Sequence, residues 1–378
     1  MFSLLYLTIG WLLYAAALPI LLLLTLFPKY RYSIPARFFL WHNPPFKESA
    51  LWFHACSFGE VRALAPIVQA LERACNITVI TQTGYEAAGR YEGERRYLPF
   101  EIFLPFWVQK EKALVVMEAE LWYMLFVSAK KRGIPTYLIN ARISERSFGR
   151  YLRFGWFYRK IFAHIDLVFA QSEADRERLL QLGARRVEVT GNIKSVAPVT
   201  VTRRFEKPQR ELLVVASTHE GEEEEILREL DLKGRCVVVV PRHPERFPRV
   251  ARVVEKLAQE RGVAFHRYSQ NSTLSGDIVL MDRMGELVNL YAIADIVILG
   301  GSFVEGVGGH NPLEPAYFGV KLVSGPYFFN QKALYPLVEG IEVCPLGRIE
   351  AGIAGANQVQ IVSRADLHPI IEELQRVV

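Results

Sequence analysis

Several carboxylates in this sequence come directly after apolar runs, where the end of a strand can hold a proton-transferring group. In the stretch HACSFGE, Glu60 lies in the first turn of an expected helix, just after Ser57 and Gly59. A carboxylate at that point is often only a stabiliser of the helix dipole. Because the turn also lies at the mouth of an expected cleft, we interpret Glu60 as a candidate general base.

Two further stretches place charged groups at strand ends in the same half of the chain. The stretch MEAELW has Glu118 and Glu120 immediately after a run of apolar residues. Glutamates in that position favour a functional role over an accidental one. The stretch GNIK closes another strand with Lys194, a cation available to a phosphate or to a developing negative charge.

The second half of the chain carries groups suited to an anion. The stretch STHEGEE places Ser217 and Thr218 where the N-cap of a helix belongs, and such a terminus is a good anion site. The stretch PRHPERF puts Arg242 and His243 directly after a strand of four valines. Since the planar guanidinium of arginine matches phosphate oxygens, we expect a nucleotide phosphate as its partner.

Two other stretches of this half are less specific. RMGELVNLY offers Gly285 and Glu286, and the glutamate opens an expected helix. The acidic run EGEEEE, residues 220–225, is interpreted as the solvated first turn of a helix rather than as a metal site.

The stretch LGGSFVEGVGGHNPLEP, residues 299–315, concentrates five glycines within ten residues before an expected helix. So much backbone freedom indicates that something approaches the main chain closely. With a proline near the first position of the helix, free N–H groups predict an anion or nucleotide site. We expect Glu314 to accept hydrogen bonds from ribose hydroxyls, and His310 and Asn311 to contact a phosphate or a base. A glycine-rich loop by itself is a weak signal.

Strands that alternate with helical patterns position these groups. Apolar, β-branched runs predict parallel strands in both halves, and helices are expected at 61–74 and 366–378. The expected strands are 51–55, 77–83, 113–118, 136–141, 167–171 and 187–192, followed by 212–217, 236–241, 277–282, 295–301 and 321–325. We therefore predict two doubly wound α/β domains that face each other across a cleft, with ligands outside the carboxyl ends of the strands.

The first 28 residues contain no Asp, Glu, Lys, Arg or His, and as a helix they are long enough to cross a bilayer. A cleaved signal peptide is the alternative, because residues 15–17 are all alanine. We favour an uncleaved anchor, since no positive charge precedes the apolar run and the run is longer than in a signal peptide. Lys29, Arg31 and Arg37 follow at once, which places the body in the cytoplasm. A kink at Pro19 leaves shallow insertion open.

These patterns divide the chain into four parts. We predict a membrane anchor at 1–28, an N-terminal domain at 29–197, a linker at 198–210 and a C-terminal domain at 211–378 that ends in a closing helix. With 378 residues, 51% of them hydrophobic and 22% charged, the chain is not largely disordered. Its four cysteines are far apart, which argues against a disulfide framework or a zinc ribbon.

A basic and aromatic stretch, RSFGRYLRFGWFYRK at 146–160, contains five basic residues, six aromatic residues and no acid. Part of it is expected to be an amphipathic helix whose aromatic side chains face the core. Its composition also suits an anionic membrane surface and the phosphates of a glycolipid. The net charge is only +5 and no RNA- or DNA-binding motif accompanies the stretch, so we expect no nucleic-acid partner.

Eight motifs, taken in order, resemble the successive motifs of one family. They are HACSFGE, MEAELW, NARISERS, GNIK, STHEGEE, PRHPERF, MGEL and GGSFVEGVGGHNPLEP. The series is similar to the Kdo transferases, which move 3-deoxy-D-manno-oct-2-ulosonic acid (Kdo) from CMP-Kdo to lipid A precursor (lipid IVA) in lipopolysaccharide synthesis. The resemblance implies the GT-B glycosyltransferase fold, with the acceptor in the N-terminal domain and the CMP-sugar in the C-terminal domain. It also implies a location on the cytoplasmic face of the bacterial inner membrane.

The resemblance implies roles for individual residues. Glu60 would deprotonate the acceptor hydroxyl, in an inverting displacement that releases CMP without a covalent intermediate. Catalysis and acceptor binding would further use Glu118, Glu120, Lys194, Ser57, Gly59 and Arg142. CMP would be held by Ser217, Thr218, Pro241, Arg242, His243, Met284, Gly285, Glu286, Gly309, His310, Asn311, Pro312, Leu313 and Glu314. No D-x-D motif stands in a suitable place, so we expect no metal, and no cofactor besides the donor CMP-Kdo.

Other functions remain open at this point. They are a GT-B enzyme that uses a UDP-sugar, a sugar-nucleotide 2-epimerase, and a non-catalytic membrane-tethered nucleotide-binding protein of the same fold. The anchor argues against the epimerase, and the motif series argues against both the epimerase and the UDP-sugar enzyme. The non-catalytic protein is disfavoured because the candidate site residues are intact: Glu60, Glu120, Lys194, Arg242 and Glu314. Two departures from the family pattern are the YM that follows MEAELW in place of Pro-Asn, and the NPPFKES before the first strand in place of a glycine-rich link. Neither removes a residue with an implied catalytic role.

Overall fold

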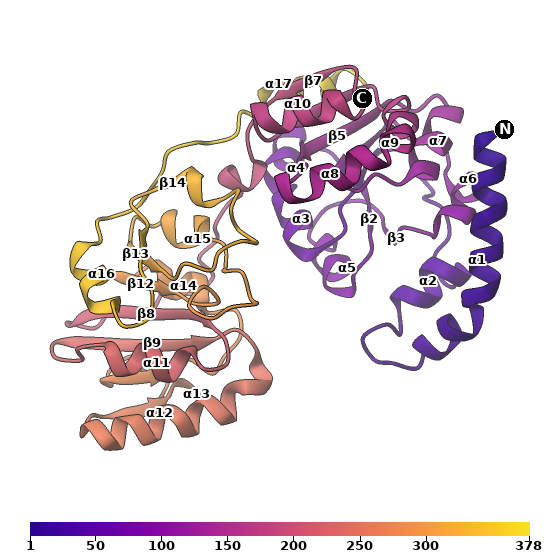
Figure 1. Ribbon diagram of the computed structural model, residues 1–378. Coiled ribbons are helices and arrows are strands. Elements are labelled where there is room, and N and C mark those ends of the chain that lie inside the picture. The colour runs from indigo at the N-terminus through magenta and orange to yellow at the C-terminus, as the bar shows by residue number, and fades with distance from the viewer. The chain divides into compact units, whose positions relative to one another are not determined.

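The chain folds into two compact units, each built around its own parallel sheet (Figure 1). The computed structural model describes residues 1–378. The N-terminal unit comprises Met1–Pro198 and Ala365–Val378, and the C-terminal unit comprises Val199–Arg364. The chain therefore passes between the units twice.

A seven-stranded sheet forms the centre of the N-terminal unit, in the order β3-β2-β1-β4-β5-β6-β7, with every neighbouring pair parallel. The strand order reverses between β1 and β4, and ligands of doubly wound sheets bind at such a point. All six predicted strands are confirmed. The seventh, β3, was not predicted because two of its three residues are arginines. The strands are β1 (Leu51–His54), β2 (Cys75–Val79), β3 (Arg95–Tyr97), β4 (Ala113–Met117), β5 (Thr136–Ala141), β6 (Leu167–Ala170) and β7 (Val187–Val189).

Helices cover this sheet, and it contributes to two separate clusters of buried apolar side chains. The single helix predicted at 61–74 is two helices, because Pro66 lacks a backbone N–H and begins a new helix at α4. The helical segments are α3 (Phe58–Ala63), α4 (Ala65–Leu71), α5 (Gln82–Ala88), η1 (Glu101–Phe103), α6 (Leu104–Trp107), α7 (Tyr123–Lys131), α8 (Glu145–Arg153), α9 (Gly155–Phe162), α10 (Glu173–Gln181) and η2 (Ile193–Val196).

The C-terminal unit repeats this plan with the order β10-β11-β9-β8-β12-β13-β15, and its strand order reverses between β8 and β12. Its parallel strands are β8 (Glu211–Thr218), β9 (Arg235–Pro241), β10 (Phe265–Arg267), β11 (Ile278–Leu280), β12 (Ile296–Leu299), β13 (Lys321–Ser324) and β15 (Glu342–Val343). A small antiparallel pair, β14 (Val338–Glu339) and β16 (Gln360–Ile361), lies apart from this sheet. The helices are α11 (Glu222–Glu229), α12 (Phe247–Arg261), α13 (Tyr268–Asn271), α14 (Leu287–Tyr291), α15 (Leu313–Ala316) and α16 (Ile349–Gly355).

The end of the chain corrects the predicted domain boundary at 378. The last helix, α17 (His368–Gln375), was expected to close the C-terminal domain, but it belongs to the N-terminal unit. There Ile370 and Leu374 are fully buried in the same apolar cluster as residues of α4. An amphipathic pattern predicts a helix but does not say on which unit its apolar face is buried.

The N-terminal helix α1 (Phe2–Leu24) has 23 residues and is long and apolar enough to cross a membrane. It is followed by the short helix α2 (Ser33–Phe39). Length and composition alone therefore agree with the predicted anchor.

Candidate active site

The predicted base Glu60 is held in the turn between β1 and α3. Ser57 is the N-cap of α3, and its hydroxyl donates a hydrogen bond to Glu60 Oε1 at 2.8 Å. The backbone N–H of Cys56 donates to Glu60 Oε2, also at 2.8 Å. These bonds resemble a capping box, in which the first turn of a helix satisfies its own donors. They also fix the carboxylate at the carboxyl end of β1.

The protonation of Glu60 is tuned to neutral pH. Its pKa is raised to about 7, chiefly by burial and then by the negative charge of Glu118. The two hydrogen bonds act in the opposite direction and lower the pKa. A carboxyl group with a pKa near 7 can both accept and release a proton near neutral pH. A structural cap alone would not require this shift.

Glu118 and Lys194 are brought together as an ion pair. Lys194 Nζ is 2.7 Å from Glu118 Oε1, and the two side chains come from the end of β4 and from η2. Glu118 has φ +55° and Asn140, at the end of β5, has φ +53°. Asn140 Oδ1 accepts a hydrogen bond from the Ile193 N–H at 3.0 Å, which places η2 against the sheet. Left-handed non-glycine residues are uncommon and cluster at functional sites.

Glu120 lies near residues for which the sequence indicated no role in chemistry. A carboxylate oxygen of Glu120, a ring nitrogen of His54 and the sulfur of Cys56 lie within 4.8 Å of one another. Arg37, interpreted from sequence only as a charge beside the membrane, extends from α2 to the same place. Its Nε donates to the Leu98 carbonyl at 3.0 Å, and the charge of Glu120 acts on its guanidinium.

This group resembles a metal site in composition, and the neutral imidazole of His54 suits a metal, but the Cys56 thiol does not. Burial lowers the pKa of His54 to about 3, so that its imidazole is neutral. Burial also raises the pKa of the Cys56 thiol, although zinc takes the thiolate. The positive charge of Arg37 and the negative charge of Glu120 also attract each other. We therefore interpret the group as a hydrogen-bonded network around Glu120.

Two other predicted acceptor residues stand at the same edge of the sheet. Gly59 is exposed in the first turn of α3, and an added Cβ would meet no atom within 4 Å. The packing of the protein itself therefore does not require glycine there. Arg142 directly follows β5 and is half-buried, and its guanidinium makes no hydrogen bond or ion pair within residues 1–378. It is a fixed cation without a protein partner.

In the C-terminal unit, Ser217 and Thr218 do not form the predicted N-cap. Both belong to β8, and α11 begins four residues later at Glu222, with Gly221 as its N-cap. Thr218 is fully buried, and its hydroxyl donates to Glu223 at 2.7 Å. The predicted N-cap is wrong because the strand continues beyond its apolar run, whereas donor binding by these two residues stays a prediction.

The charges of Arg242 and Glu314 both act on the side chain of Tyr291. Tyr291 is buried, and its pKa is raised chiefly by burial and then by the charge of Glu314, while Arg242 lowers it. Arg242 follows Pro241 at the end of β9 and is exposed. The neighbouring His243 is also exposed. This edge of the sheet therefore presents a guanidinium and an imidazole to solvent.

His310 is stacked on His219, a residue that the sequence analysis had not singled out. The two Nε2 atoms are 3.0 Å apart and the rings stack with centroids 5.2 Å apart. Burial lowers the pKa of His310 to about 4, so that its ring is neutral and the pair shares one hydrogen bond. Gly301 has φ +69°, and a Cβ there would lie 2.8 Å from the His310 ring. Glycine is required at this position to admit the ring.

The glycine-rich loop is held by a carboxylate from the acidic run. Glu222 was predicted to be solvated but is fully buried. Its Oε2 accepts from the N–H groups of His219 at 2.8 Å and Gly301 at 2.7 Å, and its Oε1 accepts from the Phe303 N–H at 3.0 Å. The prediction is wrong because three backbone donors replace the water that this carboxylate loses.

The end of the loop is more ordered than its composition indicates. The Gly309 N–H donates to the Gly301 carbonyl at 2.8 Å, which closes the loop. Asn311 Oδ1 accepts from the Leu313 N–H at 3.0 Å, and Pro312 is the N-cap of α15. The predicted helix therefore exists but has only four residues, and one of its first N–H groups is already satisfied.

The third predicted donor segment, 284–286, follows β11. Met284 is 58% exposed and Gly285 has φ +85°. Glu286 accepts a hydrogen bond from Asn289 Nδ2 at 2.8 Å. Asn289 Oδ1 in turn accepts from the Thr202 N–H at 2.9 Å, so Glu286 is tied to the predicted linker. The Glu286 carboxylate therefore takes part in the contact between α14 and the linker segment.

Comparison with known proteins decides the family. A family model described as 3-Deoxy-D-manno-octulosonic-acid transferase (kdotransferase) matches residues 32–197. The 3-deoxy-D-manno-octulosonic acid transferase of Haemophilus influenzae is 32% identical over 349 residues, covering 83% of this chain and 80% of that protein. This chain belongs to the Kdo transferase family. The transferase of Aquifex aeolicus is 29% identical and covers 88% of this chain and 90% of its own length.

A solved structure shows the fold of this Kdo transferase family member. The UDP-GlcNAc 2-epimerase of Neisseria meningitidis superimposes with a TM-score of 0.58 over 87% of this chain and 100% of that one, at 14% identity. At that identity the likeness shows the fold alone. The predicted GT-B architecture and the predicted family are both confirmed, and the chain is a glycosyltransferase.

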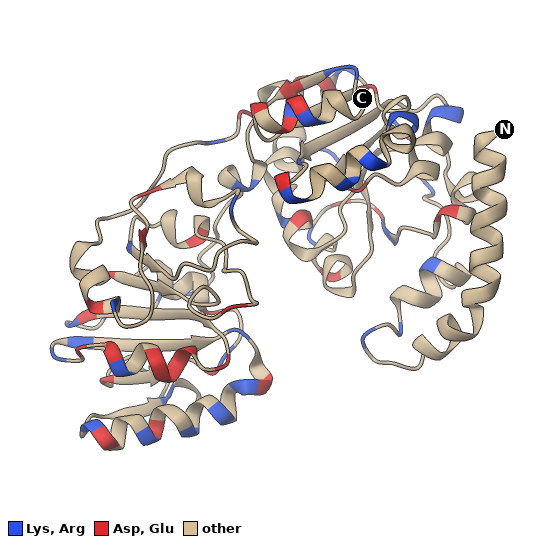
Figure 2. Cartoon of the chain, viewed as in Figure 1, with Lys and Arg blue, Asp and Glu red and all other residues tan.

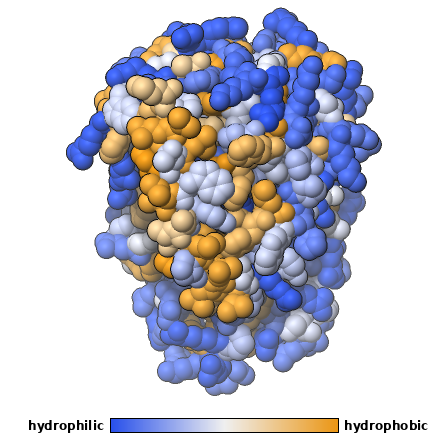
Figure 3. All heavy atoms as spheres, turned by 90° about the vertical axis from the view of Figure 1, so that its right-hand side faces the viewer, coloured by the Kyte–Doolittle hydropathy of each residue, from blue (hydrophilic) through white to orange (hydrophobic).

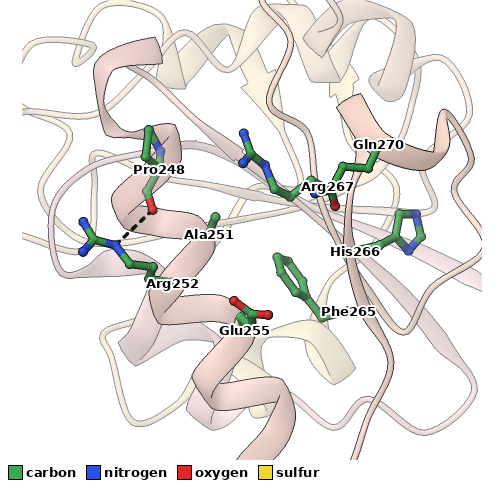
Figure 4. A pocket seen from close by; sticks show the side chains of 8 residues that line it. All are labelled: Pro248, Ala251, Arg252, Glu255, Phe265, His266, Arg267 and Gln270. Carbon is green, nitrogen blue, oxygen red and sulfur yellow. Dashed lines mark hydrogen bonds between the residues drawn. The ribbon is translucent and has the colours of Figure 1, made fainter.

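The C-terminal unit also contains a cavity of about 410 Å³ between α12 and β10, away from every predicted site residue (Figure 4). Its cations are engaged elsewhere, since Arg252 bonds the Pro248 carbonyl of its own helix and Arg267 Nε donates to Asp282 at 2.8 Å. Glu255 adds a negative charge to the wall. Nothing in the cavity converges on a single ligand.

Proposed function

We propose that this protein transfers Kdo from CMP-Kdo to a hydroxyl of lipid A precursor, with Glu60 as the base. The observation that carries the proposal is the Glu60 carboxylate, whose pKa is raised to about 7 at the end of β1. Membership of the Kdo transferase family supports the donor and the sugar. Lipid A precursor as the acceptor rests on the family resemblance of the N-terminal motifs.

The reaction is a direct displacement at the anomeric carbon of Kdo. Glu60 takes the proton of the acceptor hydroxyl, the acceptor oxygen forms the new bond to the anomeric carbon, and the bond to the CMP phosphate oxygen breaks on the opposite face. The electron pair of that bond leaves with CMP, and the configuration is inverted. The negative charge of Glu118, itself paired with Lys194, helps to raise the pKa of Glu60 to a value that suits a base.

The leaving phosphate gains negative charge in this step. Arg242, exposed at the end of β9, offers a guanidinium to its oxygens. The glycine-rich loop, fixed by Glu222 and by the His219–His310 pair, offers backbone N–H groups without a rearrangement at the moment of reaction. No metal or additional cofactor enters this proposal.

We place the reaction at the cytoplasmic face of the inner membrane. The lipid acceptor is anchored in a bilayer, and α1 is a long apolar helix. The unpaired cation Arg142 and the basic helices α8 and α9 suit the phosphates of a glycolipid. These groups belong to the same unit as Glu60.

Mass spectrometry of lipid A precursor incubated with CMP-Kdo and the purified full chain tests the proposal. The wild type is expected to add the mass of Kdo, and the mass gain counts the transfers. Glu60→Gln should give no product, whereas Glu177→Gln, an equivalent change on the exposed side of α10, should behave as wild type. Competition by UDP rather than CMP, or full activity of Glu60→Gln, would refute the assignment.

A further inference from the structure

The helix α1 packs against the N-terminal unit along its whole length. Seven of its positions are half-buried or buried at alternating spacings of four and three residues, which is one face of a helix. They are Ser3, Leu7, Gly10, Tyr14, Ala17, Leu21 and Leu24. A helix that left the body to cross a bilayer would contact it at one end only.

Polar side chains of α1 are hydrogen-bonded to the body on this face. Ser3 Oγ is 2.8 Å from Tyr123 Oη, and Tyr6 donates to the buried carboxylate of Glu101. Halfway along the helix, Tyr14 donates to the Phe38 carbonyl at 2.7 Å. Inside a bilayer these groups would lose their partners, at a cost of several kcal/mol each.

Close backbone packing supports the same arrangement. An added Cβ at Gly10 would lie 2.8 Å from Ile102 in η1, so a larger residue would push the helix away from the body. The ring of Phe2 meets that of Tyr123 edge-on at 5.2 Å, and Trp11 meets Phe103 at 5.5 Å. The contact is therefore shaped for this helix.

The opposite face of α1 is apolar and uncovered. Figure 3 shows a broad apolar area on the side of the molecule that carries α1, with hydrophilic side chains around it. Large side chains that are 48% to 76% exposed make up the area: Leu4, Leu5, Ile9, Leu12, Leu13, Ile20, Leu22, Leu23, Leu26 and Phe27. An exposed apolar patch of this kind marks a contact with lipid or protein.

Charge identifies lipid as the partner. Residues 1–47 contain four basic residues and no acid, and residues 146–163, on α8 and α9, contain five basic residues and no acid. Lys160 of α9 lies over the Phe2 ring of α1 at 4.8 Å, so the basic helix adjoins the anchor. Figure 2 shows α1 without a charged residue and Lys and Arg on α8 and α9. Trp156 and Phe154 are about half exposed beside them, as at a membrane interface.

We propose that α1 does not cross the membrane but lies in the plane of one leaflet of anionic phospholipid, with its outward face in the acyl region and its inward face on the N-terminal unit. This inference goes beyond the proposed function and does not depend on the sugar donor. It gives the position of the membrane relative to the acceptor site, because α2, which follows α1, carries Arg37 to Glu120. A lipid-linked acceptor would then reach the site without leaving its leaflet.

The side of the membrane on which the N-terminus lies tests this proposal directly. A protease-cleavable tag is placed before Met1 of the full chain, a second tag after Val378, and protease is added to sealed inside-out inner-membrane vesicles. An in-plane helix leaves both tags on the outside of such vesicles, so both should be cut. A crossing helix would protect the N-terminal tag there and expose it in spheroplasts, and that result would overturn the proposal.

A matched pair of substitutions tests the contact with the body. Gly10→Leu lies on the inward face and Ala16→Leu on the exposed face of the same helix. Both make α1 more apolar, so a crossing helix would respond equally to both. If α1 is docked, Gly10→Leu should lower the melting temperature of the detergent-purified protein by several degrees and Ala16→Leu should not. Equal melting temperatures for the two variants would refute the docked arrangement.

Discussion

The charged residues proposed to act in catalysis are buried to different degrees in the two units. In the N-terminal unit, carboxylates are drawn inward, and burial together with the charge of Glu118 raises the pKa of Glu60 to about 7. In the C-terminal unit, the guanidinium of Arg242 faces solvent, and the buried carboxylate Glu222 is fully used to hold backbone N–H groups. A group that removes a proton needs partial desolvation, whereas groups that receive a phosphate must stay accessible until it binds.

The two units also place unusual backbone conformations differently. In the N-terminal unit, the left-handed residues Glu118 and Asn140 use their own side chains to contact η2. Glu118 pairs with Lys194, and Asn140 accepts a hydrogen bond from the Ile193 N–H. In the C-terminal loop, left-handed glycines such as Gly301 leave the main chain open, and the ring of His310, from the same loop, fills the space. The first unit therefore presents side chains and the second presents backbone. Substitutions in either unit test this contrast.

The largest effect is expected for Glu60→Gln. An amide cannot accept the proton, so kcat should fall by about 10²- to 10⁴-fold. The affinity for CMP should be unchanged, because the nucleotide is assigned to the other unit. Single-turnover kinetics and calorimetric titration with CMP measure the two quantities, and weaker CMP binding in this variant would contradict the division of labour.

The second effect concerns Glu222→Gln, which leaves buried backbone donors of the loop without a charged acceptor. We expect CMP affinity to fall by roughly 10- to 100-fold, the equivalent of about 1 to 3 kcal/mol. Glu225→Gln is the matched control, since Glu225 belongs to the same acidic run but is exposed. Identical CMP dissociation constants for the two variants would show that the carboxylate does not organise the site.

A smaller effect is expected for Arg242→Ala, which removes one charge-assisted contact to the phosphate. CMP affinity should fall by about 10-fold, and Arg242→Lys should restore part of it without the bidentate geometry. Arg249→Ala, an exposed arginine in the first turn of α12, serves as control. If Arg242→Ala weakens CMP no more than the control does, Arg242 is not a phosphate contact.

The smallest effect is a shift in pH dependence. Glu60 acts as a base only when ionised, so kcat/KM should fall as the pH drops below about 7. Removing the neighbouring negative charge in Glu118→Gln favours ionised Glu60, lowers its pKa, and should move this acid limb to lower pH. A pH–rate profile of both proteins decides the sign, and a shift to higher pH would exclude Glu118 as the group that raises the pKa.

Local patterns predicted most of the fold. Each long β-branched run became a strand, because such a run is stable only when both of its faces are buried. The short strand β3 was not predicted because it lacks an apolar run. The single helix predicted at 61–74 is two helices because Pro66 begins a new one. These errors are local and leave the topology unchanged.

The site was predicted less evenly. Glu60, Lys194 and Arg242 stand at strand ends, where polarity follows directly on an apolar run and is visible in the sequence. Arg37 and His219 were missed as site residues because their neighbours, Glu120 and His310, are distant in sequence. Glu222 was assigned to solvent because composition does not tell which carboxylate of an acidic run faces the three N–H groups that hold it.

The sequence by itself determined the two α/β units, the order of the motifs and hence the family, because strand periodicity and strand-end polarity are local properties of the chain. Only the tertiary structure decided where α17 is buried, which carboxylate holds the glycine-rich loop, and that α1 lies along the body. Each of these depends on which surfaces meet. An apolar face or a buried charge is stabilised only by the partner that covers it, and that partner is distant in sequence.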